Sequence, residues 1–166
     1  VTSQYRYGGL KLDPNGGRGN LGFRWTHEKN LTTGLEEYVE YSTKWPFLGM
    51  ATKAYTRLDG AGNGGLLKVI TNTLSQGEGS TSYSKFAYVS KSVEESWDLN
   101  GAQFPTITSN FQYAHDPQYG DPTRVSVTSG NVTKTTEHQY WGRSAFSNDA
   151  WIIGRLRSAT VTTSKP

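Results

Sequence analysis

Glycine-rich turns recur along this chain and limit the length of any helix or strand between them. The clusters at residues 13–17, 59–65 and 100–101 combine Gly with Asn, Asp or Pro, which supply the positive or preset φ angles of tight turns. The segments between the clusters alternate polar and apolar positions, as half-buried strands do. Short turns join antiparallel neighbours, because a parallel crossover needs a dozen or more residues. The pattern predicts an all-β fold, an antiparallel meander of about 8–11 strands that forms a large twisted or curved sheet or a sandwich.

Helical patterns are weak in this sequence. The strongest candidate, residues 35–41, is rich in Tyr and Val and favours a strand with Val39 and Tyr41 on one face and Tyr38 and Glu40 on the other. Residues 89–97 have room for one helical turn. The alternation predicts strands at residues 21–26, 35–41, 50–58, 66–74, 83–93, 106–113, 123–129, 132–140 and 151–163.

Aromatic residues distinguish this chain from a disordered one. They make up 13% of its 166 residues, although hydrophobic residues reach only 34% and the mean hydropathy is -0.65. A disordered chain is poor in aromatics, because it cannot bury enough apolar area to offset the entropy of ordering. No shift in composition marks a domain boundary, so we expect a single all-β unit over residues 1–166. Both ends resemble strand flanks, and we expect the unit to be a fragment of a larger protein.

Charge, cysteine content and hydropathy exclude several classes of function. The net charge is +3, and Lys and Arg are dispersed rather than gathered into a patch that would neutralise phosphates. The absence of Cys excludes disulfides, zinc-thiolate sites and thiol nucleophiles. Apolar runs fall far short of the roughly 20 residues of a membrane span. We therefore expect no nucleic-acid partner and no membrane insertion by this segment.

Two glycine motifs suggest ligand sites but have a structural interpretation. Residues 17–22 and 60–65 both match Gly-x-Gly-x-x-Gly, yet each leads into a strand-like run rather than the helix that a dinucleotide site requires. Asp59 and Asn63 suggest a calcium loop, but Ile70 stands where a bidentate Glu is needed. Hairpin turns are the preferred interpretation, and a weak structural cation is the alternative.

Histidines and carboxylates select no catalytic pair. The pairs His27-Glu28 and His115-Asp116 place each histidine and its neighbour on opposite faces of a strand, so surface or cross-strand roles are expected for these residues and for His138. Carboxylates that could converge for glycoside hydrolysis after folding are Glu36, Glu37, Glu94, Glu95, Asp98 and Asp149. We expect no catalytic, cofactor-binding or metal-binding residue, no cofactor, and no enzyme activity.

The tryptophans allow a second interpretation. A sugar-stacking platform would gather them on one surface, whereas cross-strand packing would distribute them over the sheet. They are Trp25, Trp45, Trp97, Trp141 and Trp151.

Segments in the first part of the chain resemble the Rhs/YD-repeat family and the B components of toxin complexes. Residues 17–25 (GRGNLGFRW) are similar to the family's RGFLGF segment. Residues 33–35, Tyr41 and residues 45–50 (WPFLGM) resemble its TG…Y…FPxxGxP stretch.

The resemblance continues in the second part of the chain. Residues 113–125 resemble a YDxxGNPTRV repeat, and residues 151–156 (WIIGRL) are similar to the WLLGRL segment that follows it. Asp121 replaces the usual Asn, Ala51 stands where Pro is frequent, and residues 114–115 separate the Tyr–Asp pair. These departures affect individual turns of the family pattern. Taken in order, the resembling segments still cover most of the chain.

The resemblance implies a secreted, extracellular bacterial shell whose strands wind into a β-cocoon around a toxic polypeptide. In that family this region forms part of the wall of the shell, and catalysis resides in other segments. The expected function is therefore a non-catalytic structural shell segment, whose partners are the rest of the parent polypeptide and an enclosed toxin chain. Two alternatives remain open: a carbohydrate- or surface-binding β-module, and a β-fold glycoside hydrolase or lyase.

Overall fold

The computed structural model describes residues 2–14, 16–77, 86–113, 121–141 and 155–165. The strands of its main sheet are β1 (Ser3–Gly8), β4 (Trp25–Asn30), β5 (Leu35–Tyr41), β6 (Ala51–Leu58), β7 (Leu66–Gln76), β8 (Ala87–Ser96), β9 (Ile107–Tyr113), β10 (Pro122–Ser129), β11 (Val132–Tyr140) and β12 (Leu156–Ser164). A separate ladder contains β2 (Leu12–Asp13) and β3 (Gly19–Asn20), and η1 (Asn63–Gly65) is a single 3₁₀ turn.

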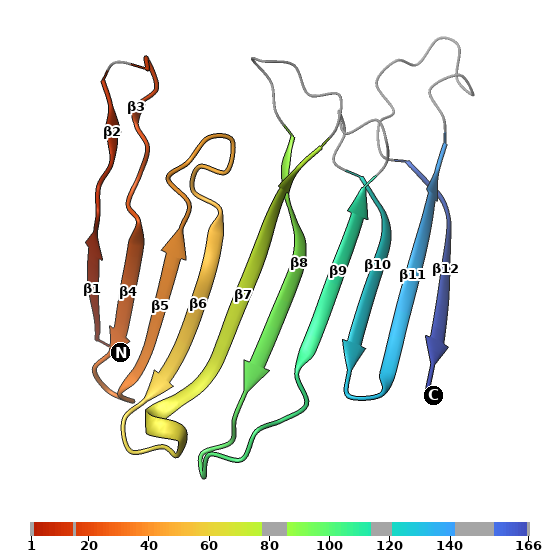
Figure 1. Cartoon of the computed structure of the whole chain (residues 1–166). Helices are drawn as coiled ribbons and strands as arrows, with labels where there is room; N and C mark the ends of the chain where they lie inside the picture. The colour runs from red at the N-terminus through yellow and green to blue at the C-terminus, as the bar shows by residue number, and fades with distance from the viewer. Residues whose placement is uncertain (1, 15, 78–85, 114–120, 142–154, 166) are drawn as a thin grey trace.

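The ten strands of the main sheet lie side by side in chain order. Each strand is antiparallel to its neighbour, and β1 and β12 form the two edges. Figure 1 shows these strands as one layer. The predicted antiparallel meander is confirmed, and of the two predicted architectures the structure has the open sheet rather than the sandwich. No helix in the described ranges is long and apolar enough to cross a membrane.

The alternation in the sequence placed most strands correctly. Segments 35–41 and 132–140 coincide with β5 and β11. The strand predicted at residues 21–26 is wrong in position, because Gly22 has a φ of 87° and the ladder resumes only at Trp25. The helical turn at residues 89–97 is also wrong, since most of this segment belongs to β8. Outside the described ranges lie the predictions for the His115-Asp116 pair, Asp149, Trp151, and the start of the strands at 83–93 and 151–163.

The β2–β3 ladder extends the β1–β4 hairpin beyond the main sheet. Backbone hydrogen bonds continue across the gap, from Lys11 N to Gly22 O at 3.1 Å and from Arg24 N to Gly8 O at 3.0 Å. The extension contacts the loop between β5 and β6, where the Arg18 guanidinium lies 3.8 Å from the centre of the Trp45 ring. The small ladder is therefore an appendage of one hairpin and not a second layer.

Two loops at one end of the sheet approach each other closely at Gly62. Its N–H donates to Leu99 O at 2.8 Å, and a Cβ built at this position would lie 2.3 Å from the carbonyl carbon of Asn100. Only glycine tolerates such an approach of two backbones. This contact fixes the loop that carries η1 beside the turn that follows β8.

The sheet has almost no interior. In the described part of the chain Val69 is the single buried hydrophobic residue, at 8% exposure, whereas thirteen large apolar side chains are exposed. The accessible surface is 11058 Å², about a third more than the roughly 8,200 Å² expected for a compact protein of this mass. Half-buried side chains that shield one another within each face therefore replace a core between two layers.

Candidate functional site

A pocket of about 450 Å³ lies on one face of the sheet, over β4 to β7. Its volume is within the range of small-molecule binding pockets. Both aromatic and charged side chains contribute to it, and η1 closes one side. The lining residues are His27, Glu36, Tyr38, Tyr55, Arg57, Asn63, Gly64 and Leu66.

Strand register brings these side chains together. His27, Tyr38 and Tyr55 are consecutive cross-strand partners on β4, β5 and β6, and Glu36 is opposite Arg57. Cross-strand partners share a face, and residues two apart on one strand share it too. One row of rings and one row of charges therefore lie next to each other above the same three strands.

Glu36 is the centre of a small ion cluster. Lys29 Nζ lies 2.5 Å from Glu36 Oε1, and His27 Nε2 lies 3.4 Å from Glu36 Oε2. The hydrogen bond from Lys29 lowers the pKa of the Glu36 carboxyl below its ordinary value, and the same bond raises the pKa of Lys29. Lys29 also lies 3.7 Å from Asp59. Lys29 therefore joins the two carboxylates Glu36 and Asp59.

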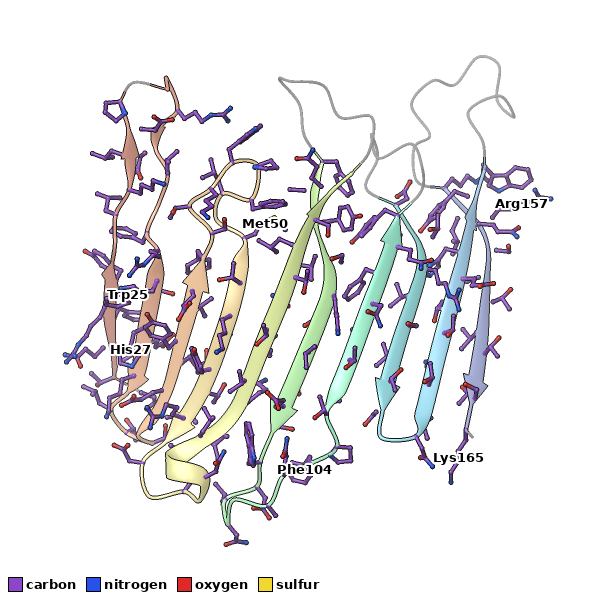
Figure 2. All side chains as sticks on the ribbon, in the orientation of Figure 1. Trp25, His27, Met50, Phe104, Arg157 and Lys165 are labelled. Atoms are coloured by element: carbon purple, nitrogen blue, oxygen red, sulfur yellow. The ribbon has the colours of Figure 1, made fainter. Side chains whose placement is uncertain are left out.

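Aromatic rings form a row across β4 to β6. The Tyr38 ring centre is 5.6 Å from that of Trp25 and 5.8 Å from that of Tyr55. Such pairs stabilise a sheet beyond the area they bury. Burial raises the pKa of the Tyr38 phenol. Figure 2 labels Trp25 and His27 along β4, and Trp25 packs over Gly8, where a Cβ would lie 2.6 Å from the indole.

Arg57 has a different environment from the other charges. It is opposite Glu36 in the ladder, but Glu36 turns to Lys29 and His27. The Arg57 guanidinium instead donates one hydrogen bond to Gly64 O at 2.9 Å. Among the described residues no carboxylate lies within ion-pair distance of it. In the described residues Arg57 therefore has no ion-pair partner within 4 Å, although the Glu36 carboxylate lines the same pocket.

The structure places the predicted histidines in cross-strand positions. His27 faces Tyr38 and the pocket, whereas Glu28 points to the other face and accepts a hydrogen bond from Tyr5 at 2.9 Å. His138 on β11 has a buried Nδ1 that lacks a hydrogen-bond partner in the described part of the chain. The expected separation of His27 from Glu28 is confirmed.

The acidic residues considered for hydrolysis are dispersed. Glu36 and Glu37 are adjacent on β5, and Glu94 and Glu95 are adjacent on β8, so each pair is divided between the two faces. Asp98 Oδ1 accepts two backbone hydrogen bonds, at 2.9 and 2.8 Å, in the turn after β8. The two pairs lie on strands that β6 and β7 separate.

The tryptophans do not form one platform. Trp25 lies on β4, Trp45 in the loop after β5, and Trp97 after β8, where it bridges to Gln103. Trp141 lies under the Arg157 guanidinium at 5.1 Å. The four described tryptophans are therefore dispersed over the sheet and its loops, and Trp25 packs against a ring on the neighbouring strand.

The glycine motifs are turns, as expected. Residues 17–22 contain β3 and lead to β4, and residues 60–65 contain η1 and lead to β7. In the ranges that the structure describes, no group of three or more His, Asp or Glu side chains is arranged to hold a metal ion.

The pocket itself was not predicted. Its residues were visible in the alternation of β5 and β6, but the site depends on which strands pair and in which register. It depends as well on η1, whose residue Asn63 has a φ of 51°. The one usable signal was the repetition of aromatic and charged residues at every second position of residues 25–29, 36–40 and 53–57.

Comparison with known proteins gives a structural likeness without a sequence match. No family model and no curated protein matches the sequence. The crystal structure of TcdB2-TccC3 is similar over 98% of this chain, with a TM-score of 0.52 and 9% sequence identity, and the chain spans 12% of the length of that protein's chain. At this identity the likeness concerns the fold alone.

Proposed function

We propose that this chain is a non-catalytic wall segment of a larger secreted bacterial shell protein of the Rhs and toxin-complex type, and that the shell encloses a toxic polypeptide. The observation that carries the proposal is the absence of a core. A single sheet with one buried hydrophobic residue among those described gains little from burial by itself. Covering by neighbouring segments or by an enclosed chain would supply the missing contacts.

The edge strand β12 supports continuation of the sheet. All nine of its residues are exposed. Its one charged residue, Arg157, and the register shift against β11 lie at the start of the strand, whereas residues 158–164 have neither a charge nor a proline. Natural proteins protect free edges with charges, prolines or bulges, because an open edge pairs with other strands. The proposed neighbour of β12 is a further strand of the parent polypeptide.

The comparison and the sequence resemblance support the same proposal from different directions. The likeness to TcdB2-TccC3 extends over nearly the whole chain, and the resembling segments occur in order along the sequence. A wall role also fits the dispersed carboxylates. The proposal assigns catalysis to no residue of this chain.

Protease protection in the parent polypeptide tests containment. Deletion of residues 132–164, which removes β11 and β12, should open the wall, so that an enclosed chain becomes digestible. The matched control replaces residues 11–21, in the β2–β3 extension outside the main sheet, by a short glycine turn and should leave protection intact. A parent protein without an associated chain, or equal protection in both variants, would contradict containment.

A further inference from the structure

The pocket over β4 to β7 has a chemical character that a wall role alone does not require. It combines two tyrosine rings, several polar side chains and one guanidinium without an ion pair among the described residues, within about 450 Å³. We propose that this pocket binds an acidic carbohydrate, a sugar ring that bears a carboxylate as in a uronate. The inference does not depend on containment, since it concerns one site on one face.

Arg57 would recognise the carboxylate. A guanidinium has five N–H donors in a planar fork that matches a carboxylate with two parallel hydrogen bonds. Of these donors the described residues use one, for Gly64 O at 2.9 Å. Glu36, which lies opposite Arg57 in the ladder, is bonded to Lys29 and not to Arg57. The remaining donors are available for an anionic ligand.

Tyr38 and Tyr55 would support the sugar ring. Their rings lie 5.8 Å apart at an angle of 53° and line the floor of the pocket. The C–H faces of a pyranose pack against aromatic rings, and phenol hydroxyls offer polar contacts at the edge. The aromatic row continues to Trp25, whose ring centre is 5.6 Å from that of Tyr38, so a longer saccharide would extend in that direction.

The rim favours a sugar over an acidic peptide side chain. His27, Glu36 and Asn63 surround the floor together with Arg57. His27 and Glu36 already contact each other, whereas the Asn63 amide offers both a donor and an acceptor, which sugar hydroxyls can satisfy. An Asp or Glu side chain would pair with Arg57 but has no hydroxyl to offer to Asn63.

Calorimetric titration of the full chain tests the proposal. The probes are a galacturonate trisaccharide, a neutral galactose trisaccharide of the same length and a short glutamate peptide. We expect the galacturonate to bind most tightly. Arg57→Gln should weaken its binding about tenfold, the effect of one charge-assisted contact at an exposed rim, and Arg57→Lys, which keeps the charge without the fork, should restore part of the affinity.

The control variant is Arg124→Gln, because Arg124 lies on β10, outside the pocket, 3.8 Å from Glu137. It should bind the galacturonate as the unchanged chain does, and circular dichroism should show the same β content for all variants. Tighter binding of the glutamate peptide would assign the pocket to a protein partner and overturn the proposal. Equal binding of neutral and acidic sugars, unchanged binding by Arg57→Gln, or no binding of any probe would overturn it as well. The outcome of the protease experiment in the parent polypeptide is independent of this one.

Discussion

The two halves of the sheet cover their single layer of strands with different side chains. Strands β4 to β7 carry a row of aromatic rings beside a row of charges, and this half contains Val69, the one buried hydrophobic residue in the described chain. Strands β9 to β12 carry rows of Ser and Thr over most of their length, such as the 2.9 Å hydroxyl bond between Thr128 and Thr133. Their ring contacts gather at one end of the strands, where Tyr113 lies 4.4 Å from Tyr88 and His138 lies 6.3 Å from Tyr140. Large rings cover one another within a single layer, whereas short hydroxyl side chains cover less area.

This contrast predicts unequal stability. The aromatic half should keep more of its structure in the isolated chain than the hydroxyl half does, because its rings bury area against cross-strand neighbours. The hydroxyl half has shorter side chains over its ladders, and its edge strand β12 is exposed at every position. We therefore expect the hydroxyl half to depend more on the proposed neighbour of β12.

The largest effect is expected at the centre of the aromatic row. Tyr38→Ala removes contacts with the Trp25, His27 and Tyr55 rings and should lower the free energy of unfolding by about 2–3 kcal/mol. Thr135→Ala, in the middle of β11 opposite Thr162, should cost about 0.5 kcal/mol. Urea unfolding measures both, and equal losses would remove the distinction between the halves.

A smaller effect is expected for a pair of identical substitutions. Val69→Ala, at a position with 8% exposure, should lower the free energy of unfolding by about 1–2 kcal/mol. Val161→Ala, on β12 at 56% exposure, should change it by less than about 0.5 kcal/mol. Thermal unfolding of the two variants compares the halves with side-chain chemistry held constant. A larger loss at Val161 would show that β12 is covered in the isolated chain.

The smallest effect is expected when the pH is lowered. The pKa of Glu36 is lowered from the ordinary value of 4.5 by its bond to Lys29, so its stabilising contribution is complete above that pH and is lost as the pH falls below it through the lowered pKa. Since the side chain is 25% exposed, the contribution should be under about 1 kcal/mol. Glu36→Gln should therefore be less stable than the unchanged chain at pH 7 and equal to it at pH 2, measured by urea midpoints.

The control for the pH experiment is Glu137→Gln, on β11 in the hydroxyl half. Glu137 lies 3.8 Å from Arg124, and the two side chains are 60% and 48% exposed. An ion pair this open contributes little, so the urea midpoint should stay unchanged at pH 7. A pH-dependent loss at Glu137 that matches the one at Glu36 would contradict the assignment of the ion cluster to the aromatic half.

The sequence predicts the strands well because their alternation is local. Val39 and Tyr41 lie on one face of β5 and Tyr38 and Glu40 on the other, as the period of two requires. The bounds of β11 are also as predicted. The error at residues 21–26 has a local cause as well. Gly22 adopts a positive φ of 87°, and a strand pattern that contains glycine does not reveal whether the ladder is interrupted there.

The number of layers and the pocket depend on contacts between residues far apart in the sequence. Both faces of β5 to β7 mix polar and apolar residues, so alternation fits a sheet in a sandwich and a sheet alone equally well. The contact of Glu36 with His27 and Lys29 needs the register of β4 against β5, and the bond from Arg57 to Gly64 needs the fold of the η1 loop. None of these is a property of neighbouring residues in the sequence.

Thiol labelling on the two faces of β9 tests the single layer most directly. The chain has no native Cys, and Thr108 and Ser109 are adjacent, half-buried and on opposite faces. In the full chain Thr108→Cys and Ser109→Cys should react with a small thiol reagent at rates within about tenfold of each other, because exposure controls thiol reactivity. Protection of one position by a hundredfold or more, with the other reactive, would mean that a second layer covers that face and would contradict the account.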